Sequence, residues 1–125
     1  QAMENKFKES RFIEQIMVIG EGEKFPAALV VPCFDFVKDW ADRKGIDLGD
    51  KSEQSISTNE MDVARIQKEI DKYNAEFGSW EKVKQIQMLN RELSIENGEL
   101  TPTLKLKRKK IMEIHADKVN AIYPS

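Results

Sequence analysis

Two short apolar segments, separated by a glycine-containing polar loop, constrain the fold of this chain more than any other feature. Residues 12–19 begin with a partial alternation of apolar and polar residues and end in a run of four apolar residues. Residues 27–31 are wholly apolar and rich in branched side chains. Both segments are short enough to be buried strands. Gly20, Gly22 and Pro26 punctuate the loop between them, so we predict a β-hairpin here. The Gly-Glu-Gly triplet lacks the further features of a phosphate-binding loop.

Apolar residues at helical spacing predict three helices in the first part of the chain. Met3 and Phe7 lie four residues apart, and a second stripe over residues 34–41 should end at Gly45. The clearest pattern runs from residue 63 to residue 77, where apolar residues step by three and four without a break. Residues 48–59, rich in Gly, Asp and Ser, are predicted to be a loop.

The second part of the chain predicts a third strand, a small hairpin and a last helix. Gly78 and Ser79 should stop the preceding helix, and residues 80–84 should turn the chain. Residues 85–88 alternate as a half-buried strand does. Asn97-Gly98 is a strong hairpin signal, so residues 93–100 are predicted to pair on themselves. The last helix has a predicted buried stripe of Met112, Ala116, Val119 and Tyr123, flanked by Ile111 and Ile122.

These elements together predict an α+β fold, with a small, mainly antiparallel sheet of about three strands, helices packed on it, and the short hairpin near 93–100. With 125 residues, of which 40% are apolar and 34% charged, the chain suits one domain, 1–125, with a modest core. A net charge of −2 provides no global field that would recruit nucleic acid or a membrane.

Metal and disulfide chemistry have little support in the sequence. Cys33 is the only cysteine, which excludes an internal disulfide and a multi-cysteine zinc site and weakly favours a reducing, cytoplasmic setting. His115 has no second ligand at metal spacing, so we predict a packed or surface histidine and no metal site. No apolar run is long enough to span a bilayer.

The stretch with the most chemical character is basic. Pro102 disfavours the helical region for Thr101, so residues 101–104 are predicted to form an extended, stiff loop that ends at Lys105. An unbroken basic run, Lys107 to Lys110, then stands at the start of the last predicted helix. The helix dipole disfavours cations there by roughly 0.3–1 kcal/mol each, so we infer that something outside the fold uses them. The plainer alternative is a solvated basic turn.

Two blocks of sequence resemble one known family. The segment GELTPTLKLKRKKI, residues 98–111, resembles the closing motif of the AMP-forming acyl-CoA synthetases, in its long-chain fatty-acid–CoA ligase version. The segment FIEQIMVIGEGEKFPAALVVP, residues 12–32, resembles the hairpin that opens the small C-terminal domain of the same enzymes. Leu104 departs from the broader superfamily, where a glycine usually precedes the lysine, and fits the long-chain subgroup.

The resemblance implies a function that this chain performs only with a larger protein. It implies the mobile C-terminal domain of an adenylate-forming enzyme whose N-terminal adenylation domain is absent here and is the expected partner. Lys105 matches the catalytic lysine of adenylation, and Lys107, Arg108 and Lys109 are candidates to bind the phosphates of CoA. ATP, CoA and a fatty acid are the implied substrates, with Mg²⁺ on the missing domain and no cofactor in this fragment, which alone should be inactive.

A second interpretation comes from a different functional class. The basic patch over residues 105–110 could serve a non-enzymatic binding module that holds nucleic acid or an acidic partner. The net negative charge and the lack of aromatic residues among the lysines argue against nucleic acid as a partner. For the full-length enzyme we expect a cytoplasmic location, with peripheral membrane association as the alternative.

Overall fold

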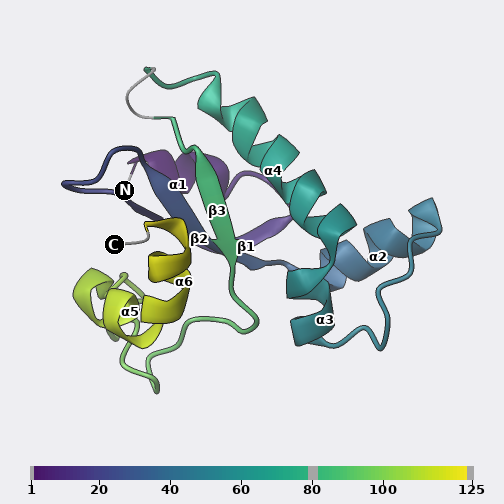
Figure 1. The fold of residues 1–125 in the computed structure, drawn as a ribbon. Coiled ribbons are helices and arrows are strands. Elements are labelled where there is room, and N and C mark those ends of the chain that lie inside the picture. Colours follow the sequence, from purple (N-terminus) through teal and green to yellow (C-terminus); the bar gives the residue numbers. More distant parts are fainter. Residues whose placement is uncertain (1, 79–81, 124–125) are drawn as a thin grey trace.

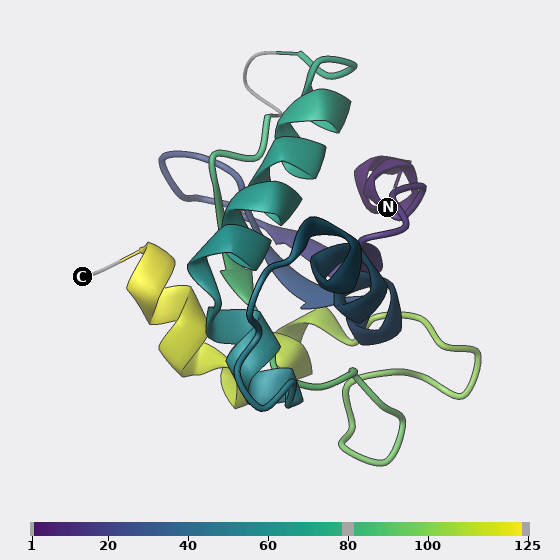
Figure 2. The same cartoon turned by 90° about the vertical axis from the view of Figure 1, so that its right-hand side faces the viewer.

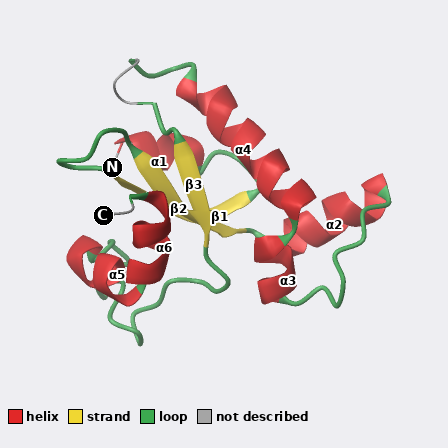
Figure 3. Cartoon of the chain, in the orientation of Figure 1, coloured by secondary structure: helices red, strands yellow, loops and turns green. Residues whose placement is uncertain are grey.

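The two apolar segments pair as predicted in the computed structural model, which describes residues 2–78 and 82–123. Strand β1 (Ile13–Ile19) lies antiparallel to β2 (Ala27–Pro32), with an irregularity in register between Ile13 and Gln15. Strand β3 (Gln85–Met88), the predicted third strand, pairs in parallel with the other edge of β2. The sheet therefore has the order β1-β2-β3, with β2 in the centre (Figure 3).

Strand β2 is buried along its whole length because helices cover both faces of the sheet. Ala28 and Val30 point into one apolar cluster, whereas Ala27, Leu29 and Val31 point into a second one. A strand that is covered on both faces has no polar side, which explains its uninterrupted apolar sequence. The α+β class and the mostly antiparallel sheet that the sequence predicted are confirmed.

Four helices cover the first face: α1 (Ala2–Phe7), α2 (Phe34–Lys44), α3 (Glu53–Thr58) and α4 (Glu60–Asn74). Figures 1 and 2 show α2, α3 and α4 together on one side of the sheet. The predicted aromatic packing of α2 is present, since the rings of Phe36 and Trp40 lie 4.9 and 5.6 Å from the ring of Phe12. Gly45 ends α2 in the left-handed conformation, with φ of 69°.

The predicted loop over residues 48–59 was wrong in part, because it contains α3. Ser52 caps this helix through a hydrogen bond from the Ser55 amide to its hydroxyl, 3.1 Å long. Asn59 then ends α3 and caps α4 by accepting from the amides of Met61 and Asp62. Six residues are too few to show a helical period, so only these caps mark α3 in the sequence.

The second face carries α5 (Arg108–Ile114) and α6 (Ala116–Ile122) instead of the one final helix that was predicted. His115 separates them, with φ of −105° and ψ of 32°. The break changes the buried stripe: Ile111, His115 and Ile122 are buried, whereas Ala116 is exposed. The predicted stripe followed one helical period through this break, and a kink resets that period.

The hairpin predicted at residues 93–100 was also wrong. Residues 94–99 form a turn in which the amide of Gly98 donates to the carbonyl oxygen of Ile95. The chain instead folds back over residues 100–106, where Leu100 and Leu106 form an isolated antiparallel bridge. The turn predicted at 80–84 falls partly outside the described residues. Within the described ranges, none of the helices has the length and apolar character needed to cross a membrane.

Candidate functional site

The site is built around a tight two-rung hairpin that carries Lys105. The amide of Thr101 donates to the Lys105 carbonyl oxygen over 2.9 Å, and the amide of Lys107 donates to the Glu99 carbonyl oxygen over 2.8 Å. The predicted extended loop at 101–104 is therefore a tight turn, closed by a 2.8 Å hydrogen bond from the Leu104 amide to the Thr101 carbonyl oxygen. We call residues 99–107 the lysine hairpin.

Leu104 gives the lysine hairpin its shape. Its φ is +65°, the left-handed region that glycine adopts far more easily than leucine. A turn followed by one left-handed residue is the usual three-residue hairpin loop, in which the extra residue forms a bulge. Proline at position 102 suits the first corner of that turn. The position where the resembling superfamily usually has glycine is therefore the one whose backbone conformation favours glycine.

Lys105 is exposed and faces a small hollow. The hollow has a volume of about 190 Å³ and is bounded by α1, β1 and the lysine hairpin, with Asn5, Lys8, Gln15 and Leu104 among its lining residues. Within the described part of the chain, the Lys105 ammonium forms no ion pair. Lys105 is thus a positive charge on a hydrogen-bonded backbone turn, with no counterion among the described residues.

Arg108, in contrast, is partly exposed but is paired with another part of the fold. Its guanidinium pairs with the carboxylate of Glu4 and donates to the Val18 carbonyl oxygen over 3.1 Å. Glu4 is only 5% exposed and also accepts from the Val18 amide over 2.7 Å. A contact between α1, β1 and α5 therefore supplies part of the negative charge that the basic start of α5 requires. Our inference that something outside the fold uses these cations does not hold for Arg108, which has a partner within the chain.

Lys107, just before α5, and Lys109, in its first turn, are exposed and form no ion pair with a described residue. Lys107 occupies the N-cap position without a side-chain cap. The structure thus divides the predicted basic set. Lys105, Lys107 and Lys109 are available to an anion, whereas Arg108 already has a buried partner.

We predicted no role for Glu99 from the sequence, yet this carboxylate lies at the foot of the lysine hairpin and is fully buried. Arg91 donates to both of its oxygens, over 2.8 and 2.9 Å, and His115 Nε2 donates to Oε2 over 2.6 Å. Burial alone would raise the pKa of Glu99, but the hydrogen bonds from Arg91, His115 and the Ser94 amide outweigh it and lower the pKa. The carboxylate is therefore ionised, and the predicted packed histidine is its partner.

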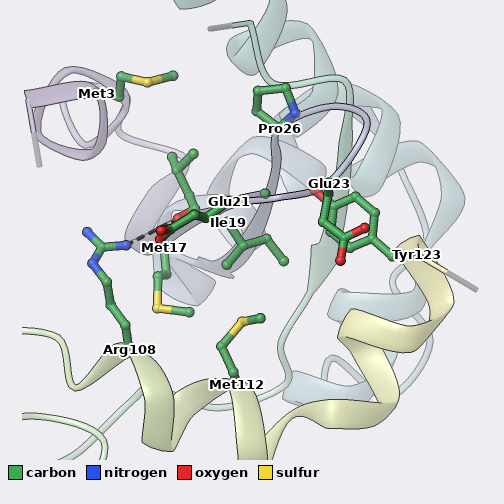
Figure 4. Close-up of a pocket in the computed structure, with 11 residues that line it drawn as sticks. Met3, Met17, Ile19, Glu21, Glu23, Pro26, Arg108, Met112 and Tyr123 are labelled. Atoms are coloured by element: carbon green, nitrogen blue, oxygen red, sulfur yellow. Dashed lines mark hydrogen bonds between the residues drawn. The ribbon is translucent and has the colours of Figure 1, made fainter.

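A larger hollow of about 430 Å³ lies elsewhere, between α1, the β1–β2 loop and the last two helices (Figure 4). Met3, Met17 and Met112 give it an apolar lining, and the carboxylates of Glu21 and Glu23 stand at its edge. Lys105 does not line it. Arg108 also lines this hollow, so its polar rim carries both signs of charge and does not select for an anion. No cluster of three or more metal-binding side chains occurs among the residues that the structure describes.

Comparisons with known proteins show the family of this chain. The family model of the AMP-binding enzyme C-terminal domain matches residues 1–125. The chain is 32% identical over 124 residues to the human long-chain-fatty-acid–CoA ligase 6. The alignment covers 97% of this chain and 17% of that protein. It is 27% identical over 121 residues to the long-chain-fatty-acid–CoA ligase FadD15 of Mycobacterium tuberculosis, covering 97% of this chain and 20% of that protein. The chain thus spans a fifth or less of these relatives.

A solved structure supports the fold. The adenylation domain of the carboxylic acid reductase from Segniliparus rugosus, in complex with AMP and a co-purified carboxylic acid, superposes with a TM-score of 0.74 at 21% identity. The match covers 98% of this chain and 17% of that one. Since the family model spans every residue, this chain belongs to the AMP-binding enzyme C-terminal domain family.

Proposed function

We propose that this chain is the C-terminal domain of a long-chain fatty-acid–CoA ligase and supplies, through Lys105, the ammonium that assists adenylate formation. The observation that carries the proposal is the placement of Lys105. It is exposed, has no described counterion, and stands on a turn with a two-rung ladder. The relatives with 32% and 27% identity are named long-chain-fatty-acid–CoA ligases, which points to a fatty acid as the substrate.

In the first half-reaction, a fatty-acid carboxylate oxygen attacks the α-phosphorus of ATP. A new bond forms between that oxygen and phosphorus, and the bond to the bridging oxygen breaks, which releases pyrophosphate and leaves an acyl-adenylate. Negative charge builds up on the carboxylate and on the α-phosphoryl oxygens, and an ammonium placed between them stabilises it without any proton transfer. Lys105 suits this task because its ammonium has no ion pair with a described residue that would have to be broken first.

In the second half-reaction, the thiolate of CoA attacks the acyl carbon, and AMP leaves as the carbon–oxygen bond to the phosphate breaks. We propose that the domain rotates between the two steps, which withdraws Lys105 and presents another face to CoA. Lys107 and Lys109 are the side chains of this chain that we assign to the CoA phosphates, since Arg108 is held by Glu4. Mg²⁺ and the nucleotide pocket belong, in this proposal, to the rest of the enzyme.

The test of Lys105 is a pair of single-turnover rates in the full-length enzyme. Lys105→Ala should lower the rate of adenylate formation by about 10²–10³, the usual cost of losing one charge-stabilising donor. Transfer to CoA from a supplied acyl-adenylate should stay within a few-fold of wild type. Lys68→Ala, at an exposed lysine of α4 that forms no described ion pair, is the matched control and should change neither rate. Equal losses in both steps would contradict the rotation, and no loss would remove Lys105 from the mechanism.

The assignment of CoA phosphates has its own test. Replacing Lys107 and Lys109 together by alanine should raise the Michaelis constant for CoA much more than that for ATP. Equal effects on both substrates, or none, would return these two lysines to the solvated basic turn. Arg108→Ala is unsuited to this test, because it also removes a charged partner of the buried Glu4.

A further inference from the structure

Glu99 joins the lysine hairpin to the rest of the second face through both its backbone and its side chain. Its carbonyl oxygen accepts the Lys107 amide and closes the lower rung of the hairpin, while its own amide donates to the Ser94 carbonyl oxygen over 3.0 Å. Any displacement of Glu99 therefore moves both strands of the lysine hairpin. Lys105 lies two residues from that rung.

The side chain of Glu99 fixes where this backbone stands. Both carboxylate oxygens are filled: Oε1 accepts from Arg91 and from the Ser94 amide, and Oε2 accepts from Arg91 and His115. His115 occupies the break between α5 and α6, and its backbone groups bond into both helices. The hydrogen bond from His115 to Glu99 thus ties the foot of the hairpin to the α5–α6 junction.

Resting on the role proposed for Lys105, we propose that the Glu99–Arg91–His115 cluster is a positioning unit that holds the lysine hairpin in the orientation required for adenylate formation. A buried ionic cluster stabilises a fold no better than apolar residues of the same shape would. What the cluster adds is a defined orientation of the groups that it joins, because each hydrogen bond forms only within a narrow range of distance and angle. An ammonium on a flexible four-carbon stem depends on its backbone for that orientation.

The residue to vary is His115, because two replacements separate its hydrogen bond from its bulk. His115→Gln keeps an N–H donor at a similar reach toward Glu99 Oε2, whereas His115→Ala removes the donor. Both leave the Arg91–Glu99 pair in place, so both variants should fold. In the full-length enzyme we expect His115→Ala to slow adenylate formation about tenfold or more, as small misplacements of reacting groups do. His115→Gln should stay near wild type, and transfer to CoA should change little in either.

Hydrogen exchange provides a measurement that does not depend on activity. His115→Ala should raise the exchange of the peptide covering residues 99–107, where the amides of Thr101 and Lys107 close the two rungs, by about tenfold. The peptide covering β2 should keep its protection, and His115→Gln should restore that of the lysine hairpin. Faster exchange in both peptides would mean that the variant loosens the whole domain, and unchanged exchange in both would mean that His115 does not hold the lysine hairpin. Either result would overturn the positioning role.

A matched control lies on the other face of the sheet. Glu69 is a buried carboxylate that, like Glu99, pairs with an arginine, Arg65, and it also accepts a hydrogen bond from the Ser10 hydroxyl. Glu69→Gln should leave the exchange of residues 99–107 unchanged, whereas Glu99→Gln should raise it. The two proposals fail in different ways. If Lys105→Ala has no effect on either rate, the proposed function is wrong. If Lys105→Ala acts as expected but His115→Ala leaves adenylate formation unchanged, only the positioning role is wrong.

Discussion

Glu99, at the foot of the lysine hairpin, and Asp62, in the first turn of α4, are both completely buried carboxyl groups with opposite surroundings. Glu99 accepts four hydrogen bonds, and its pKa is lowered. Neither carboxyl oxygen of Asp62 has a partner among the described residues, and burial raises its pKa to about 7. Burial therefore does not decide whether a carboxyl group is charged; the donors around it do.

The comparison also separates two ways of using a buried acid. On the face that carries Lys105, the ionised Glu99 organises a turn, a helix junction and an arginine. On the opposite face, Asp62 sits at the start of a long helix and is neutral over part of the physiological range. The first arrangement requires its charge, and the second is weakened by it. This difference leads to predictions that can be tested on the stability of the chain.

The largest effect should come from removing the Glu99 carboxylate. Glu99→Ala leaves the buried His115 and the Ser94 amide without their acceptor. Since the side chain of Arg91 is 36% exposed and can be solvated, the loss should lie at the lower end of the about 3–5 kcal/mol of unfolding free energy that breaking a buried pair costs. Urea denaturation of the chain at pH 7 measures this loss. A change below about 1 kcal/mol, the value for an exposed pair, would show that water already reaches the cluster.

Asp62 should give the next largest effect, and one with a distinct pH dependence. Its pKa is higher in the folded chain, about 7, than in the unfolded chain, so folding is favoured while the carboxyl is protonated and this contribution is lost as the pH rises through 7. Between pH 5 and pH 8 the loss should be about 2–4 kcal/mol. Asp62→Asn should make the free energy of unfolding less dependent on pH, and the variant should be more stable than the wild type at pH 8.

The pH profile of Glu99 should run the other way. Its pKa is lowered on folding, so its contribution is present above the unfolded value and is lost as the pH falls through the folded one. Urea denaturation of the wild type and of Asp62→Asn from pH 3 to pH 8 separates the two windows. Parallel profiles for these two chains would show that Asp62 has a partner in solution.

Glu4 provides an intermediate case, because it is nearly buried and has partners. Glu4→Gln removes the charge that faces Arg108 and should cost about 1–3 kcal/mol of unfolding free energy, as the loss of a charge-assisted hydrogen bond does. Glu9→Gln, at an exposed carboxylate paired with Lys6 over 3.4 Å, should cost less than about 1 kcal/mol. If Glu4→Gln and Glu9→Gln lowered the unfolding free energy equally, the Glu4–Arg108 pair would contribute no more than an exposed surface pair.

The smallest effect should lie at the turn of the lysine hairpin. Leu104 is 66% exposed and has φ of +65°, so Leu104→Gly removes backbone strain at little cost in packing. We expect a gain of about 0.5–1 kcal/mol in unfolding free energy. Leu104→Ala keeps the strained conformation and should show no gain, and a gain in both variants would mean that the exposed side chain, not the backbone, is unfavourable.

Much of the fold could be predicted because the sequence carries local periodicity. Alternation and apolar runs located β1, β2 and β3, and spacing by three and four located α2 and α4. The missed elements lack such a signal. Helix α3 has only six residues, and His115 interrupts a stripe that otherwise continues at helical spacing. The Asn-Gly pair at 97–98 predicted a hairpin, but the chain reverses around Pro102 to Leu104.

The sequence by itself determined the class of fold, the family resemblance and the position of Lys105, because each depends on residues that are neighbours along the chain. Only the tertiary structure decided which charges are paired. Glu4 and Arg108 are 104 residues apart, and Glu99 meets His115 across 16 residues and a change of direction. A charge acquires its role from the donors and the burial that surround it in space, and these come from elements whose order along the chain does not predict their contacts.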